Sequence, residues 1–466
     1  MAEDDREVRV ADRSWTVAPT FAWFTAILAG ALLVIDGDVR ALADRLTTKR
    51  ADQPAGPAAT VHTASAAEVD DTDIVAKLPP APAGSHDIGA LDDVCLDGTE
   101  EKCAKWAMDG FYRAVAATKK GTLGRALRVS WYGDSVIATD DLPGRLRSRL
   151  QAELGDGGPG FVYIVPPHRF CQHTAITRTD GENWLSFAVS TSHAGDHLYG
   201  PAGASVETTN ARAGFKLVAG TATTAELYYL TQPTGGTVTL SADGAEIAKV
   251  ATAADAKAPG WAIGTAPAGA KKFELSAKGK TRLFGISLEN KAGAVVDNFG
   301  IVSVHVKSYA TADTAHWTTQ LEHRSADLVM IMIGANEAHW LGPKDAATKE
   351  YQSHYEKLLA PIRKARPDAT CLVVSPTDQA EAKDDSYVSK PIIPVLVDAQ
   401  RKAAHAQGCA FFSTFEWMGG KGSAAKWFKK HLVSSDFTHL SKSGAVKVSD
   451  AVFDALMTGA KRYADK

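Results

Sequence analysis

The chain has 466 residues, of which 45% are hydrophobic and 23% are charged, and its formal net charge is −3. This composition is typical of globular proteins, and the length allows two domains with a large core. Lysine and arginine are interspersed with acidic residues instead of forming a basic stripe, which argues against a nucleic-acid-binding protein.

The first ninety residues divide into three segments. Residues 1–16 are polar with mixed charge, and residues 17–35 are an uncharged apolar stretch of 19 residues. That length is close to the roughly 20 residues of a membrane-spanning helix and predicts an uncleaved membrane anchor. The alternative is a cleaved signal peptide, with 41–43 as the cleavage site. Residues 36–90 become rich in Ala and Pro from 51 onward and predict a flexible linker.

The five cysteines give weaker predictions. Cys95 and Cys103 are eight positions apart, a spacing that fits either a small disulfide loop in an oxidising compartment or two independent thiols. Cys371 and Cys409 each lie in an apolar, strand-like run, and we expect inert core residues there. Cys171 receives no assignment.

Strands and helices are expected to alternate on either side of a central insertion. A helix starting near 104 precedes a buried strand at 125–132 and a helix at 141–155, for which Asp141 is the expected N-cap and Gly155 the expected end. Later strands are expected at 326–337, 369–376 and 409–415, and later helices at 348–366, 390–408 and 441–463. This alternation predicts a parallel sheet covered by helices on both faces, formed by residues 91–184 and 291–466.

The insertion, residues 185–290, has a different pattern. Short alternating runs rich in Thr, Gly, Ala and Val are separated by glycine-containing turns about every ten residues. This pattern predicts an inserted antiparallel β-sandwich. Two roles are open for the insertion: it packs against or covers the rest of the protein, or it binds carbohydrate.

Ser135 lies in the connection between the strand at 125–132 and the helix at 141–155. A serine in this setting is commonly a helix N-cap. It acts as a nucleophile only where a base, an orienting carboxylate and oxyanion donors lie nearby. In an open parallel sheet such groups gather at the carboxyl ends of the strands.

Three other strand ends carry such groups. Gly334 and Asn336 follow an apolar strand, and an asparagine amide can donate to an oxyanion. Asp436 and His439 are three residues apart before the last helix, a spacing that lets the carboxylate orient the imidazole. Gly300 ends a further strand-like run, where its backbone N–H can face the same pocket. Each signal alone also fits an ordinary turn, cap or surface residue.

The order of these groups resembles that of the SGNH (GDSL-like) hydrolase family, whose four blocks carry Ser, Gly, Asn and His. The resemblance covers about residues 125 to 455 and implies a three-layer α/β/α fold. It implies Ser135 as nucleophile, Asp436 and His439 as its triad partners, and Ser135, Gly300 and Asn336 as the oxyanion hole. Two positions depart from the family pattern: Glu337 stands where an aspartate is usual, and the Gly300 match leaves Ser303 or a neighbouring amide as the alternative.

The stretch after Ser135 and the inserted sheet are similar to bacterial peptidoglycan O-acetylesterases. This narrower resemblance implies an esterase that removes acyl groups from an O-acylated glycan without metal or cofactor. Together with the apolar N-terminal stretch, it implies a catalytic domain in the cell envelope, either membrane-anchored or secreted. The alternatives are an O-acyltransferase that uses the same acyl-serine intermediate and a non-catalytic glycan-binding protein.

Overall fold

The computed structural model describes residues 91–383 and 386–464. The predicted polar segment, membrane anchor and linker at 1–90 lie outside these residues and stay predictions. Within the described ranges, no helix has both the length and the apolar character needed to cross a membrane.

The first sheet contains five parallel strands, as the sequence predicts. Their spatial order is β19 (Ala410–Phe412), β16 (Thr370–Val374), β15 (Leu328–Met332), β4 (Leu127–Gly133) and β14 (Ala294–Gly300). A two-residue strand, β1 (Leu91–Asp92), pairs antiparallel with β19 at the edge, which the sequence did not indicate. Because β4 lies between β15 and β14, the loops that follow these three strands emerge side by side.

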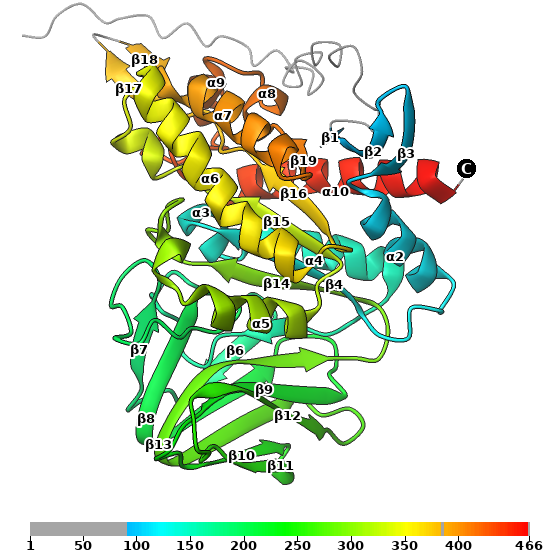
Figure 1. Cartoon of the computed structure of the whole chain (residues 1–466), viewed down its shortest axis with the longest axis vertical. Helices are drawn as coiled ribbons and strands as arrows, with labels where there is room; N and C mark the ends of the chain where they lie inside the picture. Colours follow the sequence, from blue (N-terminus) through cyan, green and yellow to red (C-terminus); the bar gives the residue numbers. More distant parts are fainter. Residues whose placement is uncertain (1–90, 384–385, 465–466) are drawn as a thin grey trace, which may run out of the picture. The chain divides into compact units, whose positions relative to one another are not determined.

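Helices cover both faces of this sheet, which makes a three-layer α/β/α arrangement (Figure 1). Leu328 and Met330 of β15 pack into the core shared with α2 (Asp109–Lys119), α4 (Asp141–Leu154) and α10 (Lys442–Ala464). Val329 and Ile331 point the other way, because side chains alternate along a strand. The core on that face is completed by α5 (Thr314–Arg324), α6 (Asp345–Ala365) and α7 (Ile392–Ala406).

Helix α4 differs from expectation at its first residue. The N-cap position is Asp140, in the left-handed conformation with φ 64°, and not Asp141. The Asp140 carboxylate makes no capping bond and instead pairs with buried Arg147, at 3.0 Å. Gly155 ends the helix as predicted.

The second sheet contains nine strands, and all of its strand pairings are antiparallel. Its longest strand, β13 (Lys272–Glu289), pairs with β8 and β10 along its first half and with β9 and β5 along its second. The sheet begins earlier than the predicted boundary at 185, because β5 and β6 belong to it. The remaining strands are β5 (Gly160–Val162), β6 (Ile176–Thr179), β7 (Leu185–Ala188), β8 (Ala204–Leu217), β9 (Thr224–Thr231), β10 (Thr237–Ala242), β11 (Ala245–Ala251) and β12 (Ala258–Thr265).

A buried ion network lies where the chain passes from the antiparallel sheet into the parallel sheet. Arg324 of α5 donates to both oxygens of Asp297 in β14, at 2.7 and 2.8 Å, and also binds Glu289 at the end of β13. Burial alone would raise the pKa of Glu289, but Arg324 and Arg128 beside it hold that pKa at about 2. The network ties a helix and both sheets together at one point.

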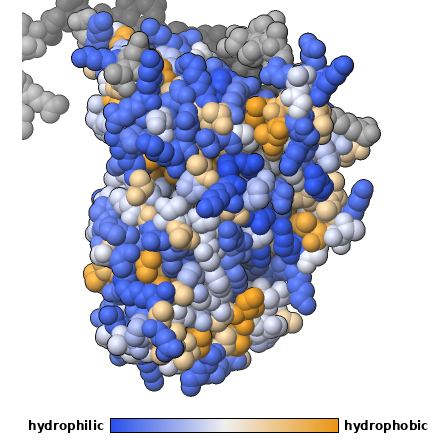
Figure 2. Space-filling model, in the orientation of Figure 1, coloured by the Kyte–Doolittle hydropathy of each residue, from blue (hydrophilic) through white to orange (hydrophobic). Residues whose placement is uncertain are grey.

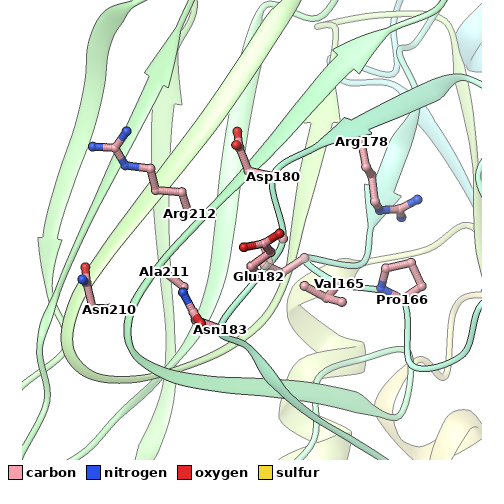
Figure 3. Close-up of a pocket in the computed structure, with 11 residues that line it drawn as sticks. Val165, Pro166, Arg178, Asp180, Glu182, Asn183, Asn210, Ala211 and Arg212 are labelled. Atoms are coloured by element: carbon pink, nitrogen blue, oxygen red, sulfur yellow. The ribbon is translucent and has the colours of Figure 1, made fainter.

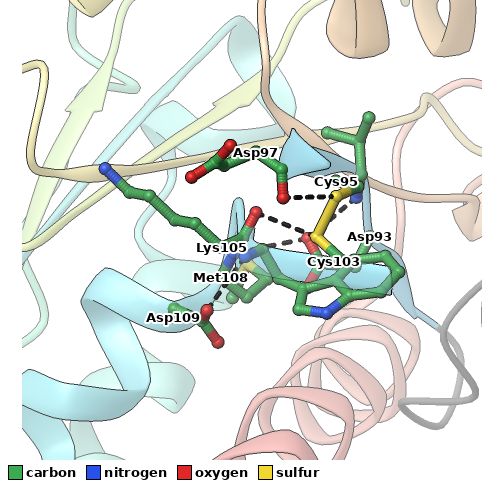
Figure 4. The surroundings of a disulfide bond; sticks show 9 residues. Asp93, Cys95, Asp97, Cys103, Lys105, Met108 and Asp109 are labelled. Carbon is green, nitrogen blue, oxygen red and sulfur yellow. Dashed lines mark hydrogen bonds between the residues drawn. A yellow bond between two sulfur atoms is a disulfide. The ribbon is translucent and has the colours of Figure 1, made fainter. Parts of the chain in front are cut away.

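The described residues contain two disulfides, one of which joins two cysteines that were predicted to be unpaired. Cys95 and Cys103 close the hairpin β2 (Cys95–Thr99)–β3 (Lys102–Trp106), one of the two alternatives the spacing allowed (Figure 4). Cys371 and Cys409 also form a disulfide, between β16 and the residue before β19, so the prediction of inert core thiols was wrong. Parallel neighbouring strands bring these two residues together across 38 positions of sequence. Cys171 is a buried free thiol.

Apolar residues on the face displayed in Figure 2 form small, separate patches among hydrophilic ones. The large apolar side chains that remain exposed come from several elements: Phe170, Leu185, Val218, Ile263, Trp340, Tyr387 and Val446.

Candidate active site

The carboxyl ends of β4, β14 and β15 meet at one edge of the parallel sheet. Gly133, the last residue of β4, is in register with Gly300 of β14 and with Met332 of β15. The segments that carry Ser135 and Asn336 therefore start from adjacent positions, as the sequence analysis predicts.

Ser135 is the first residue of the short helix α3 (Ser135–Ala138) and is not its N-cap. The capping residue is Asp134, whose Oδ1 accepts a hydrogen bond from the backbone N–H of Val136 at 3.0 Å. Asp134 Oδ2 accepts from the N–H of Ala335 at 3.3 Å and so ties this turn to the loop after β15. Because Asp134 satisfies the helix start, the Ser135 hydroxyl is left for another partner.

Asp134 is almost completely buried, with 1% of its surface exposed. Burial raises the pKa of its carboxyl to about 6, although the hydrogen bonds from Val136 and Ala335 oppose this rise. The residue has no access to a substrate and acts as a structural link between two loops of the site.

Ser135, His439 and Asp436 form a continuous chain of side chains. Ser135 Oγ lies 2.8 Å from His439 Nε2, and His439 Nδ1 lies 2.7 Å from Asp436 Oδ2. A carboxylate only accepts, so the Nδ1–H donates to Asp436, and Nε2 is the nitrogen that accepts from the serine hydroxyl. The three predicted triad residues are thus brought within hydrogen-bond distance from positions 304 residues apart.

The turn that carries Asp436 and His439 is held by local hydrogen bonds. Asp436 Oδ1 accepts from the backbone N–H groups of Thr438 and His439, at 2.9 and 3.0 Å. Partial burial acts to raise the pKa of Asp436, but these bonds and the His439 side chain lower it below its ordinary value. Asp436 therefore stays ionised. Its side chain is 51% exposed and that of His439 is 42% exposed, so the site opens to solvent.

Asn336 stands just after β15, before the 3₁₀ turn η3 (Glu337–His339). Its Nδ2 donates to the carbonyl oxygen of Val304 at 2.7 Å, which orients the amide. An amide nitrogen carries two protons, so one N–H remains to donate elsewhere.

Glu337, whose role the sequence left open, holds the loop after β14. Its Oε1 accepts from the backbone N–H of Val306 at 2.7 Å, and the side chain is fully buried. Burial raises the pKa of Glu337 to about 7, against the effect of the Val306 hydrogen bond. Asn336 and Glu337 together fix the loop at Val304 and at Val306.

Gly300 does not offer the free backbone N–H that the sequence analysis assigned to the oxyanion hole. That N–H donates to the side-chain Oδ1 of Asn298 at 2.9 Å. A Cβ at Gly300 would lie 2.3 Å from the backbone nitrogen of Ala138, so the glycine instead permits close packing against α3. Asn298 was not predicted as part of the site, although the polar pair Asp297 and Asn298 within a buried strand was a visible signal. Ser303, the alternative position, is exposed and adopts φ 66° in the loop that Asn336 and Glu337 hold.

The described residues contain no group of three His, Cys, Asp or Glu side chains placed to hold a metal ion.

Comparison with known proteins supports a GDSL-like hydrolase domain. Residues 268–446 match the model of the GDSL-like lipase/acylhydrolase family, a range that includes Asn336, Asp436 and His439 and starts after Ser135. No curated protein matches the chain.

Among solved structures, a peptidoglycan O-acetylesterase is similar with a TM-score of 0.64 and 21% identity, over 76% of this chain and 96% of that one. Two other matches have a TM-score of 0.27. One is a salicylyl-acyltransferase from a tetracycline biosynthetic pathway, with 13% identity over 60% of this chain and 94% of that one. The other is a carbohydrate esterase of family 2 with a carbohydrate-binding domain from Corynascus thermopiles (Myceliophthora fergusii). It has 12% identity over 59% of this chain and 99% of that one.

The family match and the parallel sheet with Ser135 and Asn336 beyond its strand ends lead to one identification. The chain carries a GDSL-like (SGNH) hydrolase domain, and this domain supports a serine ester hydrolase.

Proposed function

We propose that the protein is an esterase that removes O-acetyl groups from peptidoglycan or another polysaccharide, with Ser135 as its nucleophile. The observation that carries this proposal is the unbroken chain from Ser135 Oγ through His439 to Asp436, at 2.8 and 2.7 Å. A serine hydroxyl is a poor nucleophile at neutral pH, and a neutral imidazole oriented by a carboxylate is the base that activates it.

In the proposed mechanism, His439 Nε2 takes the hydroxyl proton while Ser135 Oγ attacks the ester carbonyl carbon. The imidazolium that forms is stabilised by ionised Asp436, and it then gives its proton to the departing sugar oxygen. An acyl-serine remains. His439 next takes a proton from water, which attacks the acyl carbonyl and releases acetate, and Ser135 regains its proton.

The negative oxygen of each tetrahedral intermediate needs fixed donors. The Ser135 N–H is at the start of α3, where the first N–H groups have no acceptor within the helix. The second N–H of Asn336 and the backbone N–H of Ser303 are the other donors we propose, in place of Gly300. Preorganised donors of this kind supply a large share of the rate enhancement in acyl transfer.

The choice of a polysaccharide substrate rests on two supporting observations. The fold is similar to that of a peptidoglycan O-acetylesterase, and the half-exposed triad leaves room for an ester carried on a polymer. Two disulfides favour an oxidising compartment, which agrees with a location in the cell envelope.

The proposal is tested by measuring acetate release from O-acetylated peptidoglycan, acetylated xylan and a small aryl acetate. We expect release from the glycans to depend on Ser135 and to be lost in Ser135→Ala. Undiminished release by that variant would contradict the proposal. Transfer of acetyl to an added glycan acceptor, at the expense of free acetate, would identify an acyltransferase instead.

A second candidate function, glycan binding by the antiparallel sheet, is favoured by two adjoining hollows in that sheet. One cavity of about 790 Å³ is lined by polar side chains of β6, β8 and the loop between β6 and β7, including Arg178, Asp180, Glu182 and Arg212 (Figure 3). The other, of about 610 Å³, shares Asn183 and Asn210 and adds Trp184. The Trp184 indole donates to the carbonyl of Arg212, at 3.0 Å, which fixes a partly exposed aromatic surface.

Sugar rings present hydroxyls at their edges and C–H groups on their faces, which match planar polar side chains and a fixed aromatic ring respectively. The full-length Ser135→Ala variant should therefore be retained on insoluble glycan, and Trp184→Ala in that background should release it. Equal retention of the two variants would exclude these hollows as the binding surface.

A further inference from the structure

A small hairpin formed by β17 (Ala380–Lys383) and β18 (Ser386–Ser389) has its base beside the loop that carries Asn336. Gln379 and Lys390 flank this hairpin. Lys390 donates from its backbone N–H to the Gln379 carbonyl at 2.8 Å and from Nζ to Gln379 Oε1 at 2.9 Å. Fully buried Gln379 in turn donates from Nε2 to the carbonyl of Ala335 at 3.0 Å. The hairpin base is thereby fixed to the residue before Asn336.

The same lysine also reaches the turn that carries His439. Lys390 Nζ lies 3.0 Å from His339 Nδ1, and His339 Nε2 lies 3.3 Å from Thr438 Oγ1. An ammonium group only donates, so Nδ1 of His339 must accept and its ring must be neutral with the proton on Nε2. The Nε2–H then donates to the Thr438 hydroxyl, which donates to the Asp436 carbonyl at 3.3 Å. All three bonds run in one direction, from Lys390 to the turn.

Apolar contacts hold the turn from the same side. Phe437 lies between Asp436 and His439, is only 5% exposed, and adopts the left-handed region with φ 53°. Its ring centroid is 4.4 Å from that of Tyr387 in β18 and 4.7 Å from that of Phe428. A bulky residue in this conformation requires support from its surroundings. The β17–β18 hairpin supplies part of it.

We propose that Lys390 and His339 are positioning residues, which hold the Asp436–His439 turn in the geometry that lets His439 reach Ser135. This inference rests on the esterase mechanism proposed above. Neither residue is assigned contact with the substrate. They act through Thr438 and the Asp436 backbone, on a turn whose Asp436 and His439 side chains are about half exposed.

Protonation of His339 breaks the series of hydrogen bonds from Lys390 to the turn, because its Nδ1–H would then face the ammonium of Lys390. The titratable groups around His339 are Lys390 on the hairpin side and Asp436 and His439 on the turn. Burial, Lys390 and His439 lower the pKa of His339 below its ordinary value, and Asp436 opposes them. Burial also lowers the pKa of Lys390, against the attraction of Glu381 and Asp436. The hydrogen bonds from Lys390 to the turn are therefore all present near neutral pH, and they are broken at acid pH when His339 becomes protonated.

The test compares kcat and KM for a small acetyl ester among matched variants. We expect His339→Ala and Lys390→Met each to lower kcat by about 10- to 100-fold with KM unchanged, because a small misplacement of the base slows chemistry without weakening binding. The double variant should lose no more than either single one, since both break one chain. His339→Gln should retain most of the activity, because its amide can accept from Lys390 and donate to Thr438. It should also lose less activity than wild type between pH 7 and pH 5.

Lys383→Met is the matched control, because it removes a lysine charge from the same hairpin. Within the described residues, the Lys383 ammonium makes no hydrogen bond or ion pair, so this variant should match wild type. Wild-type kcat in both His339→Ala and Lys390→Met would overturn the proposal, as would an equal loss in Lys383→Met.

The His339 tautomer gives a readout that does not depend on activity. Nitrogen-15 NMR of the histidine-labelled full-length protein should show His339 neutral and protonated at Nε2, and Lys390→Met should abolish this preference. An Nδ1-protonated His339 in wild type would overturn the inference even if the esterase function stands. The two proposals can also fail separately. If wild type shows the expected tautomer but Ser135→Ala keeps full activity, the Lys390–His339 contact stands and the proposed esterase function is rejected. The catalytic role of these hydrogen bonds is then rejected as well.

Discussion

The two halves of the active site are built differently. The half that holds Ser135 and Asn336 is anchored by buried carboxylates: Asp134 is 1% exposed and Glu337 is fully buried, and each accepts from the backbone of a neighbouring loop. The half that holds Asp436 and His439 is a turn whose functional side chains are 51% and 42% exposed. The first half is fixed by buried carboxylates, and the second is a turn whose two catalytic side chains face solvent.

Because of this difference, substitutions in the two halves should have different effects on folding stability and on kcat. A buried carboxylate that is removed leaves backbone donors without a partner, which costs about 1 to 3 kcal/mol of folding free energy. When an exposed catalytic side chain is removed, the backbone N–H groups that donated to it can bond to water. The free energy of unfolding then changes little, and the main effect is a lower kcat. We therefore expect changes in the first half to affect folding and rate together, and changes in the turn to affect the rate alone.

The largest expected effect is that of Ser135→Ala on turnover. Loss of the nucleophile should lower kcat for an acetyl ester by about 10⁶-fold, because the partners of a triad act as a unit. The measurement is initial-rate kinetics on the purified protein. Ser435→Ala, which changes an exposed serine beside Asp436, is the control and should leave kcat unchanged.

Asp436→Ala and Asp134→Ala compare the two halves directly. Asp436→Ala should lower kcat by about 10⁴-fold and change the free energy of unfolding by less than about 1 kcal/mol. Asp134→Ala should cost about 1 to 3 kcal/mol, because the N–H groups of Val136 and Ala335 lose their buried acceptor. Urea unfolding and kinetics on both variants provide the data. Equal destabilisation by the two changes would remove the distinction between the halves.

Asn336→Ala should lower kcat by about 10²- to 10³-fold, the usual effect of losing one oxyanion donor. The variant should also lose about 1 kcal/mol of stability with the hydrogen bond to Val304. Asn336→Asp keeps the size of the side chain but removes both donors, so it should be as slow as Asn336→Ala. Wild-type kcat in Asn336→Asp would exclude the amide from the oxyanion hole.

Glu337 predicts a pH dependence of stability. Its pKa is raised to about 7 in the folded protein, so between about pH 4.5 and pH 7 the folded state binds more protons than the unfolded state. Stability should therefore fall as pH rises through this window, by an amount on the order of 3 kcal/mol from this group. Glu337→Gln should remove that part of the slope in urea unfolding at pH 4.5 to 7.5.

The sequence predicted the parallel sheet and the residues at its strand ends because those depend on local patterns. Short apolar runs such as β15 are typical of buried strands, and the ends of parallel strands meet at one edge. The grouping of Ser135, Asn336, Asp436 and His439 rested on that rule together with the resemblance of their order to that of the SGNH family.

Features that depend on tertiary neighbours could not be predicted in this way. The Cys371–Cys409 disulfide requires knowing that β16 and β19 are adjacent. The N–H of Gly300 is taken by a side chain two residues away, which depends on the local geometry at the end of β14. The contact of Lys390 with His339 joins positions 51 residues apart, and neither lies in a recognisable motif. β5 and β6 pair with β13 and β8, which lie far along the chain, so their membership of the antiparallel sheet was not predicted.

The central claim is that Ser135 is the nucleophile and that His439 activates it. The most direct measurement is peptide mapping by mass spectrometry after reaction with a fluorophosphonate, a reagent that captures activated serines. We expect a single adduct on Ser135, no adduct in Ser135→Ala, and labelling slowed by at least about 10³-fold in His439→Ala. An adduct on another residue, or labelling of Ser135 at an undiminished rate without His439, would contradict the account.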